Sequence, residues 1–304
     1  DAGSDQIMTN SLGENASRLK LHGAQARARE LSRIAAEIGR EVADTAGRDV
    51  VVAGSMGPTG DIMEPVGTLS HALAVEMFEE QAVGLMEGGA DILWVETISA
   101  PEEFAAAAEA IGNVGAPWCG TMSFDTAGRT MMGVTSSGMV EMVKSLPYQP
   151  VAFGANCGVG ASDLLRTILG MAESAPDLPL VAKGNAGIPK YVDGHIHYDG
   201  TPEVMAQYAV LARDVGATII GGCCGTSPDH VKHMRDALDT HVRGPKPSLD
   251  EIVARLGEIS NGAREMNEAG PLGAKPKEQT GGGRRRRGRD PKRKAADDGK
   301  MPGQ

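Results

Sequence analysis

Short apolar runs with strand character alternate with helical runs over residues 5–240, and no hairpin signal lies between them. Strict alternation of this kind predicts parallel strands joined by right-handed crossovers. The sequence indicates seven strand–loop–helix units. The expected strands are residues 5–9, 50–54, 92–95, 118–124, 150–156, 180–183 and 217–220.

Helical periodicity follows the expected strands. The expected helices cover residues 15–46, 70–87, 137–144, 162–173, 202–214 and 228–238, and one more begins after Ser99. Three helix starts combine a capping residue, a proline and an acidic residue, which suits the free N–H groups and the dipole of a first turn. These starts are Ser99–Glu102, Thr201–Glu203 and Ser227–Asp229.

Seven units are one short of a (β/α)8 barrel, and the sequence opens at a strand. The predicted fold is therefore an α/β (β/α)8 TIM barrel that lacks its first strand. The rival is an open doubly wound sheet, but no Gly-x-Gly-x-x-Gly turn follows the early strands. The composition, 41% hydrophobic but only 3% aromatic, is typical of buried parallel strands covered by helices.

The character of the chain changes near its carboxyl end. We expect the barrel to cover residues 1–245, a short helical segment opened by a capping box at Ser248 to cover 246–269, and a disordered basic tail to cover 270–304. Residues 281–304 carry nine Lys or Arg and three Asp, whereas the chain as a whole has a net charge of −10. The rest of the chain is therefore acidic, which disfavours nucleic acid as its partner.

The sequence also limits where the protein works. It has no run of 18 apolar residues, so we expect no transmembrane helix, and we expect no signal peptide. Four cysteines in 304 residues do not make a disulfide framework, which favours a reducing cytoplasm. A homo-oligomer is left open.

Three of the cysteines follow strands and lie beside glycines. Cys223 and Cys224 stand in Gly221–Thr226, and Cys157 ends an earlier strand before Gly158. Glycine relaxes the backbone, so neighbouring sulfurs can turn toward one point, and the carboxyl ends of barrel strands meet at one mouth. Three thiolates there suit a zinc site with an open fourth position. Three buried structural cysteines, or a thiol redox protein, are the alternatives, although no CxxC pair is present.

Other polar residues follow the expected strands in the same way. They are Thr9, Glu96, Ser123 and Asn185. Because active sites of barrels lie at the carboxyl ends of the strands, we expect these side chains around the same mouth. The fourth cysteine, Cys119, lies inside a strand and is expected to be a buried thiol without a metal.

The residues at these strand ends carry a family resemblance. Gly221–Thr226, with Asn156 and Cys157 upstream, resembles the homocysteine S-methyltransferase family, most of all its bacterial betaine–homocysteine methyltransferase members. Further matches are Thr9–Ser11, Val95–Thr97 and Gly184–Gly187. The resemblance covers residues 1–240 in order.

The resemblance implies a (β/α)8 barrel whose zinc ion is held by Cys157, Cys223 and Cys224. It also implies that Glu96 binds the amino group of homocysteine, that Thr9 lies near the substrate, and that Asn185 fills the fourth zinc position until the substrate arrives. The sequence departs from the family at one place. The first strand of the family ends in an Asp-Gly pair that helps to bind homocysteine, and this sequence does not contain that strand.

The implied function is zinc-dependent methyl transfer from a small, betaine-like donor to the thiol of homocysteine, which gives methionine. S-Methylmethionine or a cobalamin cofactor are alternative donors, and an inactive, truncated barrel whose basic tail binds nucleic acid is the alternative from another class. A quaternary ammonium donor favours an aromatic cage. The aromatic residues expected near the mouth are Trp118, Phe124, Tyr191 and Tyr198.

Overall fold

A parallel sheet of seven strands forms the centre of the molecule. The computed structural model describes residues 2–175, 177–188, 190–192 and 194–260. Neighbouring strands of the sheet follow one another in chain order, and each pair is parallel. The strands are β1 (Gln6–Met8), β2 (Val51–Met56), β3 (Ile92–Ile98), β4 (Trp118–Met122), β5 (Ala152–Cys157), β6 (Leu180–Gly184) and β9 (Ala217–Gly222).

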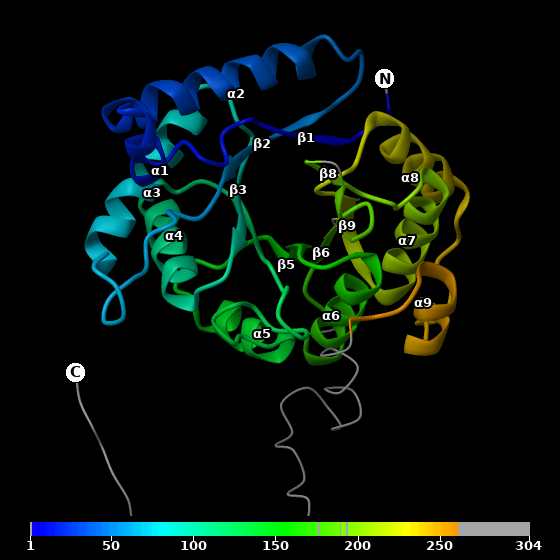
Figure 1. Ribbon diagram of the computed structural model, residues 1–304. Coiled ribbons are helices and arrows are strands. Elements are labelled where there is room, and N and C mark those ends of the chain that lie inside the picture. Colours follow the sequence, from blue (N-terminus) through cyan, green and yellow to red (C-terminus); the bar gives the residue numbers. More distant parts are fainter. Residues whose placement is uncertain (1, 176, 189, 193, 261–304) are drawn as a thin grey trace, which may run out of the picture. The chain divides into compact units, whose positions relative to one another are not determined.

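Helices lie outside the strands and surround them (Figure 1). They are α2 (Ala28–Asp44), α3 (His71–Glu87), α4 (Pro101–Val114), α5 (Ser136–Ser145), α6 (Ala161–Ser174), α7 (Pro202–Val215) and α8 (Pro228–Thr240). A strand that is followed by an outer helix and then by a parallel neighbour is the repeating unit of the TIM barrel. The predicted fold class is confirmed.

Apolar side chains fill both faces of the sheet. A large cluster lies between strands and helices and includes Leu93, Trp118 and Phe153. A smaller cluster takes residues from all seven strands, namely Met8, Ala53, Ile92, Trp94, Cys119, Ala152, Val181 and Ile219. Because successive side chains of a strand point to opposite faces, the smaller cluster is the inner core of the barrel.

The sheet is open between its two edge strands, β1 and β9. Within the described residues, no backbone ladder joins these two strands. An ion pair between Arg235 of α8 and Asp5, 2.6 Å long, ties the start of β1 to the helix that follows β9. The observed sheet is thus a seven-stranded barrel that is open on one side.

Two of the predicted helix boundaries are wrong. The helix expected over residues 15–46 is divided into α1 (Ala16–Leu19), two short 3-10 turns and α2, because Gly23 takes a left-handed conformation with φ of +66°. Helix α4 begins at Pro101 as expected, but its N-cap is Ala100, not Ser99.

A short hairpin interrupts the alternation of strands and helices. Strands β7 (Lys190–Val192) and β8 (His195–His197) pair antiparallel in the loop between β6 and α7. The expectation of a chain without hairpins is therefore wrong. Each strand has only three residues, which is too short for an apolar pattern, and the sequence Asp193-Gly194 between them is a typical hairpin dipeptide.

Helix α9 (Leu249–Leu256) begins after Ser248, whose side chain accepts a hydrogen bond from the Glu251 N–H. It lies against α6 and α7 with Ile252 fully buried. The described residues belong to one compact unit. The tail predicted over 270–304 lies outside the described residues, and the boundaries at 245 and 269 stay predictions.

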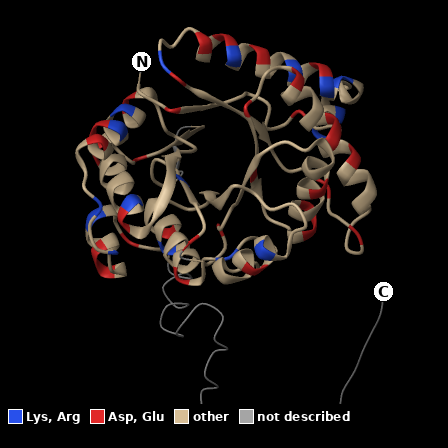
Figure 2. Cartoon of the chain, turned by 180° about the vertical axis from the view of Figure 1, so that it is seen from behind, with Lys and Arg blue, Asp and Glu red and all other residues tan. Residues whose placement is uncertain are grey.

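Charged side chains gather on the helices, while the strands carry few of them (Figure 2). Within the described residues, no helix is long and apolar enough to cross a membrane. A charged residue inside the barrel is therefore an exception, and the two that occur there, Glu96 and Lys183, belong to the site described next.

Candidate metal and substrate site

A layer of polar side chains lies above the inner core, at the carboxyl ends of the strands. Its members are Ser55, Glu96, Thr121, Asn156, Lys183 and Cys223. On four strands, the polar residue follows an inner-core residue by two positions, as Glu96 follows Trp94 and Lys183 follows Val181. Strand periodicity therefore turns these side chains toward the barrel axis. We name this set the polar layer.

Three sulfur atoms meet at one side of the mouth. The Sγ atoms of Cys157, Cys223 and Cys224 all lie within 4.8 Å of one another, and those of Cys157 and Cys224 are 3.7 Å apart. We name this group the sulfur cluster. Cys157 and Cys223 are half-buried and Cys224 is exposed, so the cluster opens toward the mouth. Three thiols converging in this way could hold a metal ion.

The backbone around the cluster has unusual conformations. Cys157 has a φ of +60° and is followed by Gly158 with a φ of +76°. A left-handed non-glycine residue is uncommon and is held in place by its surroundings. On the other loop, Gly225 has a φ of +78°, and Cys223 donates its N–H to the Gly184 carbonyl at 2.8 Å. These turns let sulfurs from two separate strand ends face one point.

Asn185 fastens the two cysteine loops together. Its side-chain oxygen accepts a hydrogen bond from the Cys224 N–H at 3.1 Å, and its side-chain nitrogen donates to the Gly158 carbonyl at 3.0 Å. The residue is 1% exposed. The observed contacts make Asn185 a positioning residue for the sulfur cluster, and its predicted place as a fourth metal ligand stays a prediction.

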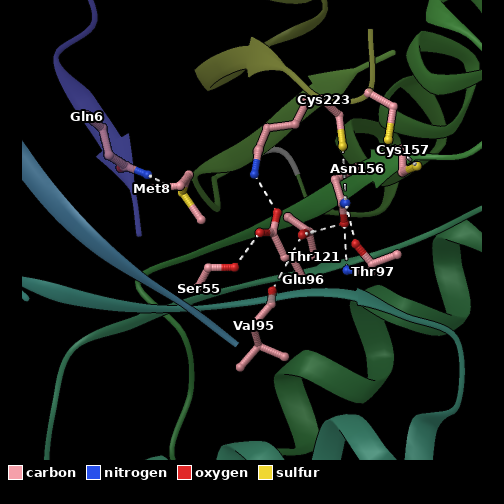
Figure 3. A network of polar contacts seen from close by, with 12 residues as sticks. Gln6, Met8, Ser55, Val95, Glu96, Thr97, Thr121, Asn156, Cys157 and Cys223 are labelled. Atoms are coloured by element: carbon pink, nitrogen blue, oxygen red, sulfur yellow. Dashed lines mark hydrogen bonds and ion pairs between the residues drawn. The ribbon is translucent and has the colours of Figure 1, made fainter. Parts of the chain in front are cut away.

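Asn156 links the sulfur cluster to the neighbouring strands (Figure 3). Its oxygen accepts from the Thr97 N–H at 2.9 Å and from the Thr121 hydroxyl at 2.7 Å. Its nitrogen donates to the Thr97 hydroxyl at 2.8 Å and lies 3.8 Å from the Cys223 sulfur. Thr97 itself is left-handed, with a φ of +65°, so these bonds hold a conformation that a β-branched residue rarely adopts.

The thiols of the metal-free cluster differ in acidity. A hydrogen bond from Cys157 lowers the pKa of Cys223 to about 6, and the charge of Lys183 and a hydrogen bond from Asn156 act in the same direction against burial and the charge of Glu96. Donation to Cys223 and burial raise the pKa of Cys157. The two neighbouring thiols are therefore shifted in opposite directions, as charge repulsion between close thiolates requires.

A carboxylate and an ammonium group face each other within the polar layer. Glu96 accepts from the Ser55 hydroxyl at 2.7 Å through one oxygen and contacts the Lys183 ammonium at 2.5 Å through the other. The hydroxyl of Thr9 accepts from the Ser55 N–H at 2.9 Å and lies 2.6 Å from the Ser11 hydroxyl. We name Thr9, Ser55, Glu96 and Lys183 the carboxylate side.

The structure adds two residues to those indicated by the sequence. Ser55 and Lys183 contact Glu96, yet the sequence analysis missed both. The available signal was the two-residue period of a strand. Ser55 follows the inner-core residue Ala53 by two positions, and Lys183 follows Val181 in the same way. Ser123 lies directly after β4 with 4% of its surface exposed, and its N–H donates to the Ile98 carbonyl. Its role stays a prediction.

The expected aromatic residues do not converge. Trp118 begins β4 at the end opposite the mouth, and its ring packs 5.5 Å from Phe104, so the expectation for Trp118 is wrong. Tyr191 is 79% exposed. Tyr198 lies beside the sulfur cluster, where its ring packs on the backbone of Gly225, since a methyl group built on this glycine would lie 2.3 Å from the Cγ of the ring.

Fold and site together define a parallel α/β barrel with a thiol cluster and a buried acid at its mouth. Residues 1–238 match the family described as homocysteine S-methyltransferase. The match covers well over half of the chain, and the protein belongs to this family.

The chain is also similar to individual members of known function. It is 29% identical over 272 residues to a methionine synthase of Mycobacterium tuberculosis, which covers 84% of this chain and 22% of that protein. A methionine synthase of Mycobacterium leprae is 29% identical, with coverage of 91% and 23%. The chain therefore spans about a fifth of the length of these relatives.

Solved structures support the fold. The metallated form of the homocysteine methyltransferase MmuM from Escherichia coli superimposes with a TM-score of 0.64 at 22% identity, covering 77% of this chain and 80% of that one. Its oxidized form gives a TM-score of 0.61 at 23% identity, with the same coverage.

Proposed function

We propose that this protein transfers a methyl group to the thiol of homocysteine and so forms methionine, with a zinc ion bound by Cys157, Cys223 and Cys224. The observation that carries the proposal is the convergence of the three sulfurs within 4.8 Å at the mouth of the barrel. The family of the chain and the names of its relatives agree with it.

The donor set suits zinc. Three cysteine thiolates leave one tetrahedral position for a substrate ligand, which is the pattern of catalytic rather than structural zinc sites. A zinc ion held by Cys157, Cys223 and Cys224 would supply one chemical effect, a lower pKa of a coordinated substrate thiol, so that a sulfur nucleophile would be available at neutral pH.

The carboxylate side orients the substrate. Glu96 is a buried acid in the polar layer, and its carboxylate can pair with the ammonium group of homocysteine. Ser55 holds one of its oxygens, and Thr9 holds the backbone of Ser55. A substrate fixed at its amino group has little freedom left at its sulfur, which favours in-line attack on a methyl group.

The reaction is a single displacement. A lone pair of the homocysteine sulfur forms the new S–CH3 bond, the bond between the methyl group and the donor breaks, and the donor leaves with that electron pair. The thiol proton goes to solvent. With a betaine-like donor, the leaving group is a tertiary amine, so a positive charge on nitrogen is lost as the bond breaks.

A small, betaine-like molecule is the first candidate for the methyl donor. Tyr198 supplies one aromatic face beside the sulfur cluster, suited to a quaternary ammonium group. Trp118 lies at the opposite end of β4 and Tyr191 is 79% exposed, so the cage is smaller than the sequence predicts.

A methyl donor bound to a partner protein, such as a methylated cobalamin, is the second candidate. Exposed apolar side chains occupy the loops after β2, β4 and β6, which all lie at the mouth. They are Ile62, Val66, Met131, Met132, Ile188, Tyr191 and Ile196. An exposed apolar rim marks an interaction surface. Most of the length of the two methionine synthases also lies outside the region matched by this chain.

The test is metal analysis of the purified full chain, followed by an assay of methionine formation from homocysteine. Betaine, S-methylmethionine and methylcobalamin are supplied in separate reactions. We expect one zinc per chain and methionine from one donor. A chain that binds no zinc after reconstitution, or that forms no methionine with any of the donors, would contradict the proposal.

A further inference from the structure

The ion pair between Glu96 and Lys183 is the least expected feature of the barrel interior. Both side chains are 11% exposed, and their charged atoms are 2.5 Å apart. An ion pair inside a protein loses hydration, and apolar residues of similar size often stabilise the fold as well or better. A role in folding therefore does not account for a lysine at the end of an apolar strand.

Lys183 stands next to the proposed methyl-transfer site. In the strand register, Lys183 is the partner of Asn156 on one side and of Gly221 on the other. Asn156 in turn donates toward the Cys223 sulfur. The lysine thus lies between Glu96 and the sulfur cluster, on the inward face of the sheet.

The described contacts of the ammonium group leave N–H donors for a second anion. Glu96 is its hydrogen-bond acceptor in the described part of the chain, and an ammonium group has three N–H donors. The ring of Trp94 lies 5.2 Å from Nζ and stabilises the positive charge without using a hydrogen bond.

We infer that Lys183 binds the α-carboxylate of the amino-acid substrate while Glu96 binds its ammonium group. An α-amino acid carries both charges on one carbon, so a lysine and a glutamate side by side are its complement. The pair that closes on itself in the free protein opens when the zwitterion enters, and each charge keeps a partner. This inference rests on the proposed function, since it assigns the carboxylate end of the same substrate.

The test compares thiols that carry one or both of the charges. Homocysteine has both, 3-mercaptopropylamine lacks the carboxylate, and 4-mercaptobutanoate lacks the ammonium group. We expect Lys183→Met to lower kcat/KM for homocysteine about 10- to 100-fold, the range for one charge-assisted hydrogen bond. The kcat/KM of Lys183→Met for 3-mercaptopropylamine should stay the same or rise, because Lys183 no longer competes with the ammonium group of this thiol for Glu96.

Lys232→Met is the matched control, since Lys232 is an exposed lysine that pairs with Asp236 on α8. It should leave the preference among the three thiols unchanged. An equal loss for homocysteine and for 3-mercaptopropylamine in Lys183→Met would overturn the inference, because a purely structural lysine would affect both. Lys183→Arg should restore part of the preference for homocysteine.

A binding experiment on the metal-free protein separates this inference from the proposed function. Calorimetry with L-methionine and with 3-(methylthio)propylamine needs neither metal nor methyl donor. Lys183→Met should weaken the binding of L-methionine alone. Equal weakening for both compounds would overturn the inference, whereas absence of methionine formation in the wild-type chain would contradict only the proposed function. If Lys183→Met does not fold, Lys183→Gln keeps a donor toward Glu96 without the charge and tests the same expectation.

Discussion

The two sides of the mouth differ in chemistry and in how they are built. The sulfur cluster comes from the end of β5 and the loop after β9, where the backbone is left-handed at Cys157, Gly158 and Gly225. On the carboxylate side, Ser55, Glu96 and Lys183 lie within β2, β3 and β6, and each follows an inner-core residue by two positions. One side is shaped by turns and the other by strand periodicity.

This difference separates two tasks of one site. Thiolates are soft ligands that suit a metal and a sulfur nucleophile, whereas a carboxylate and an ammonium suit the charged end of an amino acid. Asn156 lies between the two sides, because it contacts Thr97 on β3, Thr121 on β4 and Cys223 beyond β9. Variants on each side should therefore have separable effects.

Loss of one sulfur should have the largest effect. We expect Cys223→Ser to lose its zinc and to lower methyl transfer by at least about 1,000-fold, because one hydroxyl replaces a thiolate ligand and the bound thiol is no longer activated. Metal analysis measures the zinc content, and a methionine assay measures the rate of methyl transfer. Cys119→Ser is the matched control and should keep one zinc per chain. Retention of metal and activity by Cys223→Ser would remove the basis of the proposed function.

Changes on the carboxylate side should affect stability and substrate binding but leave the metal in place. Glu96→Gln leaves Lys183 buried without its counter-ion, and we expect the free energy of unfolding to fall by about 3–5 kcal/mol. Lys183→Met added to it should recover about 2–3 kcal/mol of that loss, since the two residues interact directly. Urea denaturation of the four members of the cycle measures this coupling. Additive losses would contradict the direct interaction of Glu96 with Lys183, whereas loss of zinc from Glu96→Gln would show that the two sides are not separable.

The link between the two sides is tested at Asn156. Asn156→Ala leaves the Thr97 N–H and the Thr121 hydroxyl without their acceptor, and we expect it to lower the free energy of unfolding by about 1–3 kcal/mol. Zinc affinity should fall about 10- to 100-fold, the range for a residue that orients metal ligands. Competition with a chelator measures the affinity. Asn113→Ala removes an exposed asparagine and should change neither quantity.

The sequence predicts the sulfur cluster better than the carboxylate side. Adjacent cysteines between glycines are a rare pattern, and glycine at residue 225 signals the turn that the structure contains. Lys183 looks like an ordinary end of a strand, because the sequence does not say which residues of seven strands share one level of a barrel. That level depends on register, and the shifts between Val95 and Ile98 and between Leu180 and Val181 have no local signal.

The same limit explains the errors in the fold. Gly23 divides the predicted long helix, although a single glycine inside a helical pattern costs only about 1 kcal/mol and is often tolerated. Trp118 belongs to the outer core because it lies an odd number of positions from Cys119 and Thr121, which face the inside of the barrel. The two-residue period of a strand predicts which face of the sheet a side chain occupies, but it does not predict where the strand begins or ends.

The smallest effect should come from the cysteine that belongs to neither side. Cys119 is fully buried in the inner core beside Trp94, and burial raises its pKa to about 12. Below pH 9 its thiol is protonated in both the folded and the unfolded chain, so its contribution to stability is fully present. Above pH 9 only the unfolded chain loses this proton, and the free energy of unfolding should fall by about 1.4 kcal/mol per pH unit until the folded thiol ionises.

Cys119→Ala removes this titration and leaves the sulfur cluster intact. Urea denaturation of both proteins between pH 8 and pH 10.5 should therefore show a steeper decline for the wild type, while other alkaline effects cancel in the comparison. Equal slopes would mean that the Cys119 thiolate is tolerated inside the barrel. The charge of Lys183 lowers the pKa of Cys119 in the folded chain, against the effect of burial. Equal slopes would therefore indicate that Lys183 stabilises the Cys119 thiolate more strongly than its ion pair with Glu96 implies.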